Sequence, residues 1–459
     1  YAEDDGDFNT AVGFEALKAQ TGTSGTTANS GLGYRAGFYN TTGVKNTYIG
    51  YHSGFGVNGN PNSSNSALGY RSLVGITTGT VNTAMGESAG ASATTASGSV
   101  FLGADAGGTV TTGNMNIAIG FDAMKGGTVT GDNNIAIGVS AGDALTSGHT
   151  NILIGIGTGG ALTTGANNVI IGSGDSTGGT ANTTMTLVGW KAGGAINSNG
   201  ANGTTAVGFQ SLTSLSSGTG NTALGTDAGK FVTTAATSTF IGFRAGQGIT
   251  GAKLTGNSNT AVGNQAGFLL QGAAGGNTLL GYLSGNVITT GTNNTVIGVG
   301  ADTDDATATN QTVIGATTIG VADNSVTLGN DDVTRVNMSS DGAAVIYANG
   351  TINTSDRRFK ENINDSDLGL EFINKVRPVK YNFKEDKHDG KTKYGIIAQE
   401  VLEVLKDSNN EDSSFIETDN SDKLGADYIQ FIAPLIKSVQ ELTEMVKAQQ
   451  KEIEELKNK

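Results

Sequence analysis

The chain has 459 residues, contains no cysteine and carries a formal net charge of −14. These features exclude a disulfide framework and zinc–thiolate sites, and an acidic chain without a basic stripe is not expected to bind nucleic acid or a polyanionic membrane surface. No apolar run reaches the roughly 18 residues that a membrane-spanning helix needs, so we expect no membrane insertion.

The composition changes sharply at Ser355. Of the 72 glycines, 68 precede this residue, whereas 39 of the 68 charged residues (27 basic and 41 acidic) fall within the last 105 positions. A glycine-rich, charge-poor segment and a charged segment need different ways of folding. The sequence therefore predicts at least two parts with a border near Ser355.

Residues 1–330 form a repeat whose unit begins with asparagine and closes a short apolar stretch with glycine. Typical units are Asn9-Thr-Ala-Val-Gly13, Asn116-Ile-Ala-Ile-Gly120 and Asn294-Thr-Val-Ile-Gly298. Most successive closing glycines are 17 residues apart, which indicates a repeat architecture. The closing glycines are Gly13, Gly33, Gly50, Gly69, Gly86, Gly103, Gly120, Gly138, Gly155, Gly172, Gly189, Gly208, Gly225, Gly242, Gly263, Gly281, Gly298, Gly315 and Gly329.

This repeat predicts a mainly β fold, a glycine-rich parallel β-roll or β-solenoid rod. The Thr/Val/Ile-rich stretches suit strands, and the Thr-Thr-Gly-Asn and Gly-Asn-Asn tracts suit turns. The glycine density excludes a helical rod, and only three prolines exclude collagen. Nineteen coils at ~4.8 Å each predict a rod of roughly 90 Å. Because the small Ala and Gly residues suit close approach of chains and cannot build a wide core for a lone chain, we expect a homotrimer.

The unit Asn-x-Ala-Ile-Gly-x-x-Ala resembles the head repeats of trimeric autotransporter adhesins. It is also similar to repeats of bacteriophage tail fibres and of bacterial surface fibres. The resemblance implies a trimeric, left-handed parallel β-roll. It also implies an extracellular fibre, on a virion tail or on a bacterial cell surface, with a cell-surface glycan or receptor as partner.

Acidic clusters at the two ends of the rod are candidate calcium sites, because calcium binds carboxylate oxygens. Neither cluster has the spacing of a calcium-binding loop, so solvated loop acids are the alternative that the pattern favours. We predict no metal and no cofactor. The residues are Asp4, Asp5 and Asp7 in one cluster and Asp302, Asp304 and Asp305 in the other.

An aromatic residue often follows the closing glycine. Such a column could stack against sugars, or it could pack one coil on the next, which is the commoner use. The three histidines are too scattered to indicate a catalytic triad or a zinc site. The aromatic residues are Phe14, Tyr34, Tyr51, Tyr70, Phe121, Trp190, Phe209, Phe243 and Tyr282.

Residues 331–354 read as a neck that caps the rod and connects it to the next domain. Val333–Met338 alternates like a strand, and Ala343–Ala348 is a second apolar run. The pairs Asp341-Gly342 and Asn349-Gly350 are turn signals.

Residues 355–427 predict a small α+β domain. Apolar spacing indicates a helix over 368–376, alternation indicates a strand over 378–383, and a strand from Tyr394 is expected to become a helix that ends near Leu405.

Residues 428–459 predict a C-terminal coiled-coil helix. Parallel self-association of this helix would support the homotrimer, and the alternative is an amphipathic helix that folds onto its own domain. The apolar heptad positions are Ile432, Leu435, Val439, Leu442, Val446, Ile453 and Leu456.

A serine and a lysine lie five residues apart at the border, at Ser355 and Lys360. A serine hydroxyl becomes nucleophilic when a base removes its proton, and a lysine can be that base once desolvation lowers its pKa. Ser355 would attack the carbonyl of Thr354, and water would resolve the ester. Asn362 is a candidate donor to the oxyanion.

The C-terminal part closely resembles the intramolecular chaperone autoprocessing domain of phage tailspikes, tail fibres and endosialidases. This resemblance implies a module that trimerises, directs folding of the preceding rod, and releases itself by one cut before Ser355. The matching pieces are Ser355-Asp-Arg-Arg-x-Lys360-x-Asn-Ile363, Val376-Arg-Pro-Val-x-Tyr381, Gly395-Ile-Ile-Ala-Gln-Glu-Val401, and Tyr428 followed by Ala433-Pro-Leu-Ile-x-x-Val-Gln-Glu-Leu442.

The leading hypothesis is a structural, adhesive trimeric fibre whose enzymatic activity is a single-turnover, Ser–Lys self-cleavage. The alternative is a tailspike enzyme that degrades a host surface polysaccharide. Such an enzyme needs two carboxylates across a groove, and the rod is too poor in acidic residues for a pair to be chosen.

Overall fold

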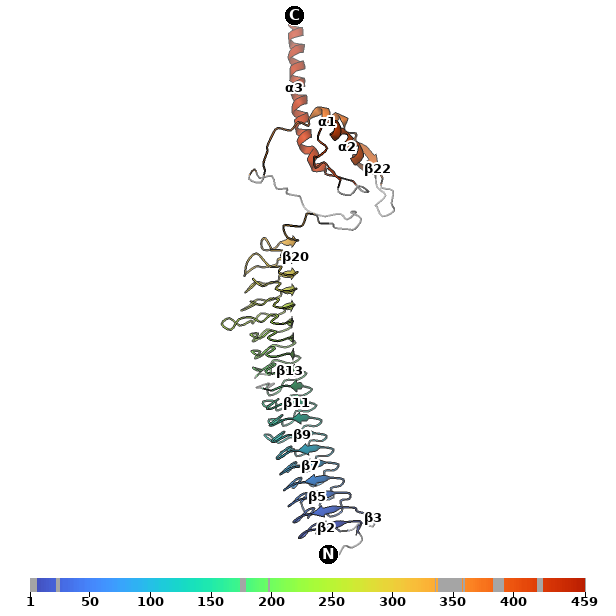
Figure 1. Ribbon diagram of the computed structural model, residues 1–459, viewed down its shortest axis with the longest axis vertical. Coiled ribbons are helices and arrows are strands. Elements are labelled where there is room, and N and C mark those ends of the chain that lie inside the picture. The colour runs from blue at the N-terminus through green and yellow to red at the C-terminus, as the bar shows by residue number, and fades with distance from the viewer. Residues whose placement is uncertain are drawn as a thin grey trace. The chain divides into compact units, whose positions relative to one another are not determined.

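The protein divides into two compact units in the computed structural model, Tyr1–Val336 and Asn337–Lys459, and each is described by itself (Figure 1). The structure describes residues 6–21, 25–173, 179–196, 199–334, 336, 357, 360–382, 392–418 and 424–458. Within these ranges, none of the helices has the length and apolar character needed to cross a membrane.

The first unit is a solenoid in which each coil contributes one three-residue strand to a single parallel sheet. Every strand pairs in register with the strands of the coils before and after it, so equivalent repeat positions stack: Ile135 on Ile152, for example, and Ala136 on Leu153. The strands of this sheet are β2 (Thr10–Val12), β4 (Ser30–Leu32), β5 (Thr47–Ile49), β6 (Ser66–Leu68), β7 (Thr83–Met85), β8 (Val100–Leu102), β9 (Ile117–Ile119), β10 (Ile135–Ile137), β11 (Ile152–Ile154), β12 (Val169–Ile171), β13 (Thr186–Val188), β14 (Thr205–Val207), β15 (Thr222–Leu224), β16 (Thr239–Ile241), β17 (Thr260–Val262), β18 (Thr278–Leu280), β19 (Thr295–Ile297), β20 (Thr312–Ile314) and β21 (Val326–Leu328).

The predicted parallel β-solenoid is thus confirmed, and the repeat unit corresponds to one coil (Figure 1). A short parallel pair, β1 (Gly6–Asp7) with β3 (Gly25–Thr26), lies beside the first coils. In the neck, the described residues Val333, Thr334 and Val336 are not in a strand, and the rest of the segment expected to be a strand or an apolar run lies outside the described residues.

The core of the rod is narrow and closes within one chain. The middle residue of nearly every strand is buried, because successive strand residues point to opposite faces of the sheet. Alanine is the commonest of these residues, and most of the others are larger side chains such as Tyr48, Phe101 and Phe240. The core is narrow, as the small residues predicted, and because it closes within one chain it does not by itself require the expected homotrimer.

A buried asparagine ladder explains why each unit begins with asparagine. Asn134 is fully buried, and its Oδ1 accepts the backbone N–H of Asn151 at 3.1 Å. Its Nδ2 donates to Asn116 Oδ1 at 3.1 Å and to Gly148 O at 2.9 Å. Buried amide groups need such partners, and here each coil supplies them to the next.

The closing glycines are required by a close contact between coils. At most of them φ lies between +126° and +145°, a conformation that L side chains rarely adopt. A Cβ on Gly138 would lie 2.4 Å from the carbonyl oxygen of Gly155, and the same overlap recurs along the rod. These glycines therefore form a second ladder in which backbone lies directly on backbone.

We expect Gly138→Ala to disrupt stacking around β10 and to increase amide hydrogen exchange in the adjacent coils. Gly157→Ala is the matched control, because Gly157 also has positive φ (+63°) but an added Cβ there meets no atom within 4 Å. Gly157→Ala should lower the free energy of unfolding only by the ~1–2 kcal/mol that an L residue costs in the left-handed conformation. Equal exchange rates in the two variants would contradict the contact argument.

The second unit is a small α+β domain followed by a long helix. It contains α1 (Leu370–Lys375), the antiparallel pair β22 (Val379–Tyr381) and β23 (Lys393–Gly395), α2 (Ala398–Asp407), the antiparallel pair β24 (Ile416–Glu417) and β25 (Gly425–Ala426), the 3-10 helix η2 (Tyr428–Phe431) and α3 (Ile432–Lys457). The helices and strands predicted for residues 368–405 are present, with shorter bounds for the first helix and the strands. The core consists of Leu368, Phe372, Val401, Leu405, Phe415, Ile416 and Phe431.

Candidate functional site

The proposed cleavage residues are only partly described. Thr354 and Ser355 lie outside the described residues. Lys360 is exposed, and its backbone N–H donates to Arg357 O at 3.2 Å. Asn362 is also exposed, has a positive φ of 52°, and its carbonyl accepts Asn364 Nδ2 at 3.1 Å. The structure therefore places the proposed base and oxyanion donor in one exposed segment and does not test their geometry with the serine.

Two motifs of the domain are joined by an ion pair. Arg377 follows α1, and Glu400 lies in the first turn of α2. Arg377 Nε donates to Glu400 Oε2 at 2.9 Å, and Arg377 Nη2 donates to the other oxygen. The hydrogen bond to Arg377 holds the pKa of Glu400 below its usual value. Because the pair is exposed, solvent screens its attraction, and its main effect is on orientation.

A third motif contacts the second through Tyr428. The backbone N–H of Ile396 donates to the Tyr428 hydroxyl at 3.3 Å. A Cβ on Gly395 would lie 2.3 Å from the same oxygen, so only glycine leaves room for the hydroxyl. The motifs quoted in the sequence are therefore neighbours in the folded domain.

Two side chains of α3, Glu441 and Lys437, hold the long helix against the start of α1, and we call these contacts the clamp. Glu441 of α3 accepts the backbone N–H of Leu370 at 2.7 Å, which caps the first turn of α1. Lys437, one turn earlier on α3, donates to the carbonyl of Ser366. Glu441 and Lys437 occupy heptad positions c and f, so the small domain packs on the side of α3 away from the a and d positions.

The a and d positions of α3 form an exposed apolar stripe, which we call the α3 seam. Their exposed fractions lie between 45% and 64%, whereas Pro434 and Ser438, nearer the clamp, are buried. The single 26-residue helix confirms the predicted C-terminal helix. Its apolar residues do not pack on their own domain, which disfavours the alternative of a lone amphipathic helix. The seam consists of Ile432, Leu435, Val439, Leu442, Val446, Ile453 and Leu456.

A pocket of about 460 Å³ lies beside the clamp, and no sequence motif pointed to it. Asp367, Glu371, Asp407 and Glu441 line it together with Lys375. Lys375 donates to Glu371 at 2.9 Å, and Glu441 already caps α1. Within the described ranges no three His, Cys, Asp or Glu side chains are grouped so that they could hold a metal ion.

In the rod, the acidic cluster near residue 302 organises its own loops. Asp302 accepts the backbone N–H groups of Val287 at 2.8 Å and Thr303 at 3.0 Å. Asp305 accepts the N–H and the hydroxyl of Thr307. These contacts agree with loop acids and not with a converging calcium site. In the other cluster, Asp7 lies in β1, and Asp4 and Asp5 lie outside the described residues.

Asp302 and Asp305 predict opposite pH dependences. Burial raises the pKa of Asp302 to about 6, so its native state holds a proton that the unfolded chain releases near 3.8. The stability it contributes is present below pH 3.8 and is lost as the pH rises to about 6. The bonds to Thr307 lower the pKa of Asp305, so its contribution is lost as the pH falls below 3.8. We expect amide protection in the β19 and β20 coils to fall as the pH rises from 4 to 7. Asp302→Asn should abolish this fall, whereas Asp305→Asn should leave it unchanged, and hydrogen exchange measures the difference.

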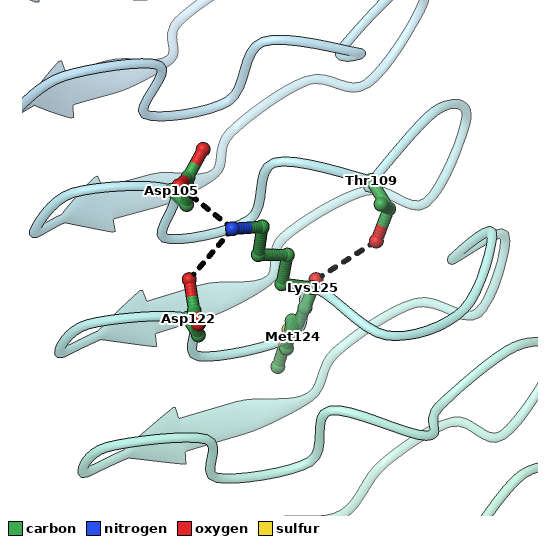
Figure 2. A network of polar contacts seen from close by, with 5 residues as sticks. All are labelled: Asp105, Thr109, Asp122, Met124 and Lys125. Carbon is green, nitrogen blue, oxygen red and sulfur yellow. Dashed lines mark hydrogen bonds and ion pairs between the residues drawn. The ribbon is translucent and has the colours of Figure 1, made fainter.

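Charged residues elsewhere in the rod fasten neighbouring coils together (Figure 2). Lys125 Nζ lies 2.7 Å from Asp105 and 2.9 Å from Asp122, which occupy equivalent positions of successive coils. The hydrogen bond to Asp105, and then that to Asp122, raises the pKa of Lys125. Because one lysine bridges the two carboxylates, this cluster is a structural clip between coils and not an acid–base pair for glycoside hydrolysis.

The aromatic column stacks where neighbouring coils both carry a ring. Ring centroids are 5.5 Å apart for Phe14–Tyr34 and 5.0 Å apart for Trp190–Phe209. The predicted packing role is thus confirmed for these pairs, and the same rings remain partly exposed.

A β-solenoid rod followed by a small α+β domain and a helix with an exposed heptad stripe fits the class of fibre proteins that carry their own folding module. Comparison with protein families supports this class: residues 355–409 match the family model described as "Chaperone of endosialidase". The chain therefore carries an endosialidase-type chaperone domain at its C-terminal end. The matched range includes Lys360, Arg377 and Glu400 and ends before η2 and α3. A search of curated proteins finds no match to the chain.

Proposed function

We propose that the protein is a trimeric adhesive fibre of a phage tail or a bacterial surface, whose C-terminal module directs trimerisation and then cuts itself off before Ser355. The observation that carries the proposal is the α3 seam. Seven apolar side chains at heptad spacing lie in solvent on a helix whose opposite side is clamped to its own domain. Exposed apolar stripes of this kind are covered by partner helices in coiled coils.

The outward face of the rod supports self-association. In the five central coils β8–β12 both outward strand positions are aliphatic, whereas most flanking coils carry Thr or Ser at the first position. These aliphatic side chains form a column that repeats once per coil. A second copy of the chain has the same repeat, so its column can pack against the first in register. The central residues are Val100, Leu102, Ile117, Ile119, Ile135, Ile137, Ile152, Ile154, Val169 and Ile171.

The proposed cleavage is a hydrolysis of the Thr354–Ser355 bond. Lys360, as a neutral amine, takes the proton of the Ser355 hydroxyl while its oxygen bonds to the carbonyl carbon of Thr354. The amide nitrogen leaves with a proton as the new amino terminus, and water then hydrolyses the ester to the carboxylate of Thr354. Since Lys360 is exposed in the single chain, the desolvation that the base needs would follow assembly of the module.

The mass of the native assembly tests the trimer. Sedimentation of the purified protein at micromolar concentration should give three copies per particle, whether or not the module has been released. A one-copy mass at that concentration would overturn the proposal. Turnover of a capsular polysaccharide would favour the tailspike alternative.

A further inference from the structure

The first coils of the rod carry a repeated pair of a tyrosine and a basic residue. The dipeptides Tyr34-Arg35, Tyr51-His52 and Tyr70-Arg71 directly follow three successive closing glycines. In-register stacking of coils therefore places the tyrosines in one column and the basic residues in the next. Beyond Tyr70 the aromatic column is interrupted by Glu87.

The rings of Phe14, Tyr34, Tyr51 and Tyr70, which we call the tyrosine ladder, form a continuous stack. Successive centroids are 5.5, 5.2 and 5.3 Å apart, with interplanar angles of 9° to 13°. Parallel rings in face-to-face contact would be ~3.5 Å apart, so these rings are offset and part of each ring stays uncovered. Between 37% and 60% of each residue is exposed.

The coils that carry the tyrosine ladder hold more basic than acidic residues although the chain is acidic, and Glu87, the next residue of the column, lies just beyond them. Residues 8–86 contain four basic residues and one acidic residue, Glu15, in a chain whose net charge is −14. Glu15 is neutralised by Lys18 and Arg35 at 2.5 and 2.7 Å. Within the described ranges, Arg71 is exposed and has no ion-pair partner. The pKa of His52 is lowered by burial and by the positive charges of Arg35 and Arg71, which places all three bases close together.

We propose that the tyrosine ladder and the flanking Arg35 and Arg71 bind an extended anionic polysaccharide along the rod. Aromatic rings and phenol hydroxyls suit sugar rings and hydroxyls, and guanidinium groups suit carboxylates and sulfates. The coil spacing of ~4.8 Å offers one tyrosine–base pair for each successive sugar of a chain. A second copy is disfavoured as occupant, because it would bring two arginine columns together. The site deepens the proposed adhesive role and rests on it.

Binding of the full-length protein to immobilised polygalacturonate, dextran sulfate and neutral dextran tests this site. We expect salt-sensitive binding to at least one anionic polymer and little binding to dextran. Arg71→Gln should weaken it about tenfold. Arg244→Gln is the matched control, because Arg244 follows Phe243 at the equivalent repeat position, with Asp227 already 3.7 Å away, and it should not change binding.

Three results would overturn the site: no anionic polymer binding above dextran, equal binding by Arg71→Gln and Arg244→Gln, or stronger competition by single-stranded DNA than by any polysaccharide. The mass of each preparation separates this proposal from the proposed fibre. Lost polysaccharide binding by an intact trimer counts against the site alone, whereas a one-copy mass counts against the trimer whatever the polymer binding.

Discussion

Replacing Ser355 with alanine should leave the chain at its full mass of 46.3 kDa, whereas the unsubstituted protein should yield a rod of 354 residues and a module of 105 residues. Alanine removes the hydroxyl that attacks Thr354, and no ester can form without it. The effect is all or none on the time scale of purification, and intact mass spectrometry measures it directly. A Ser355→Ala protein that yields the same two fragments would contradict the proposed nucleophile.

Substitutions in the segment 360–366 separate the roles in this reaction. Lys360→Arg keeps the positive charge but removes the base, because arginine does not deprotonate in proteins, so we expect no cleavage. Asn362→Gly removes the amide yet tolerates the positive φ of that position, and loss of one oxyanion donor should slow cleavage roughly 10²-fold. Ser366→Ala is the control: its hydroxyl bonds to Leu368 O, and cleavage should proceed normally.

The period of the rod could be predicted from the sequence because the closing glycine and the leading asparagine mark every coil. The physical reasons for these residues were not visible. A glycine such as Gly138 is required by the carbonyl of the next coil, and an asparagine such as Asn134 satisfies backbone groups of two neighbouring coils. Both are contacts between units, whereas sequence spacing reports only the positions within each unit.

In the second unit, heptad spacing predicted α3 but not the clamp at its outer side. Glu441 caps α1 from 71 residues away, and no local pattern links the two segments. The small residues from which we expected a trimer, such as Ala136, lie inside the core of one chain and so do not report on contacts between chains. The apolar residues that support self-association point outward, and their exposure is known only once the register of the sheet is fixed.

Loss of the α3 seam should prevent assembly of the rod. We expect Val439→Asp to yield no trimer, because a carboxylate replaces an apolar residue at an a position in each of three chains, at a cost on the order of 3 kcal/mol or more per chain. Gln440→Asp, one residue along at an exposed b position, places the same charge in the same helix and should assemble normally. Sedimentation of both variants measures the difference.

Deletion of residues 355–459 from the gene should also prevent the rod from assembling into trimers. In-register pairing of long parallel coils is slow and leaves sheet edges exposed, so chains that are not held together aggregate before they align. Association of the modules at one end sets the register and raises the local concentration of the partner coils.

Once formed, the rod should survive removal of the module, since its core and its ladders of Asn and Gly lie within residues 1–330. Trimers assembled efficiently from a chain that ends at Thr354 would therefore contradict a chaperone role, whereas stable trimers after self-cleavage agree with it. Because Lys360 is exposed in the single chain, Val439→Asp should also remain uncut, which distinguishes cleavage that follows assembly from cleavage that precedes it.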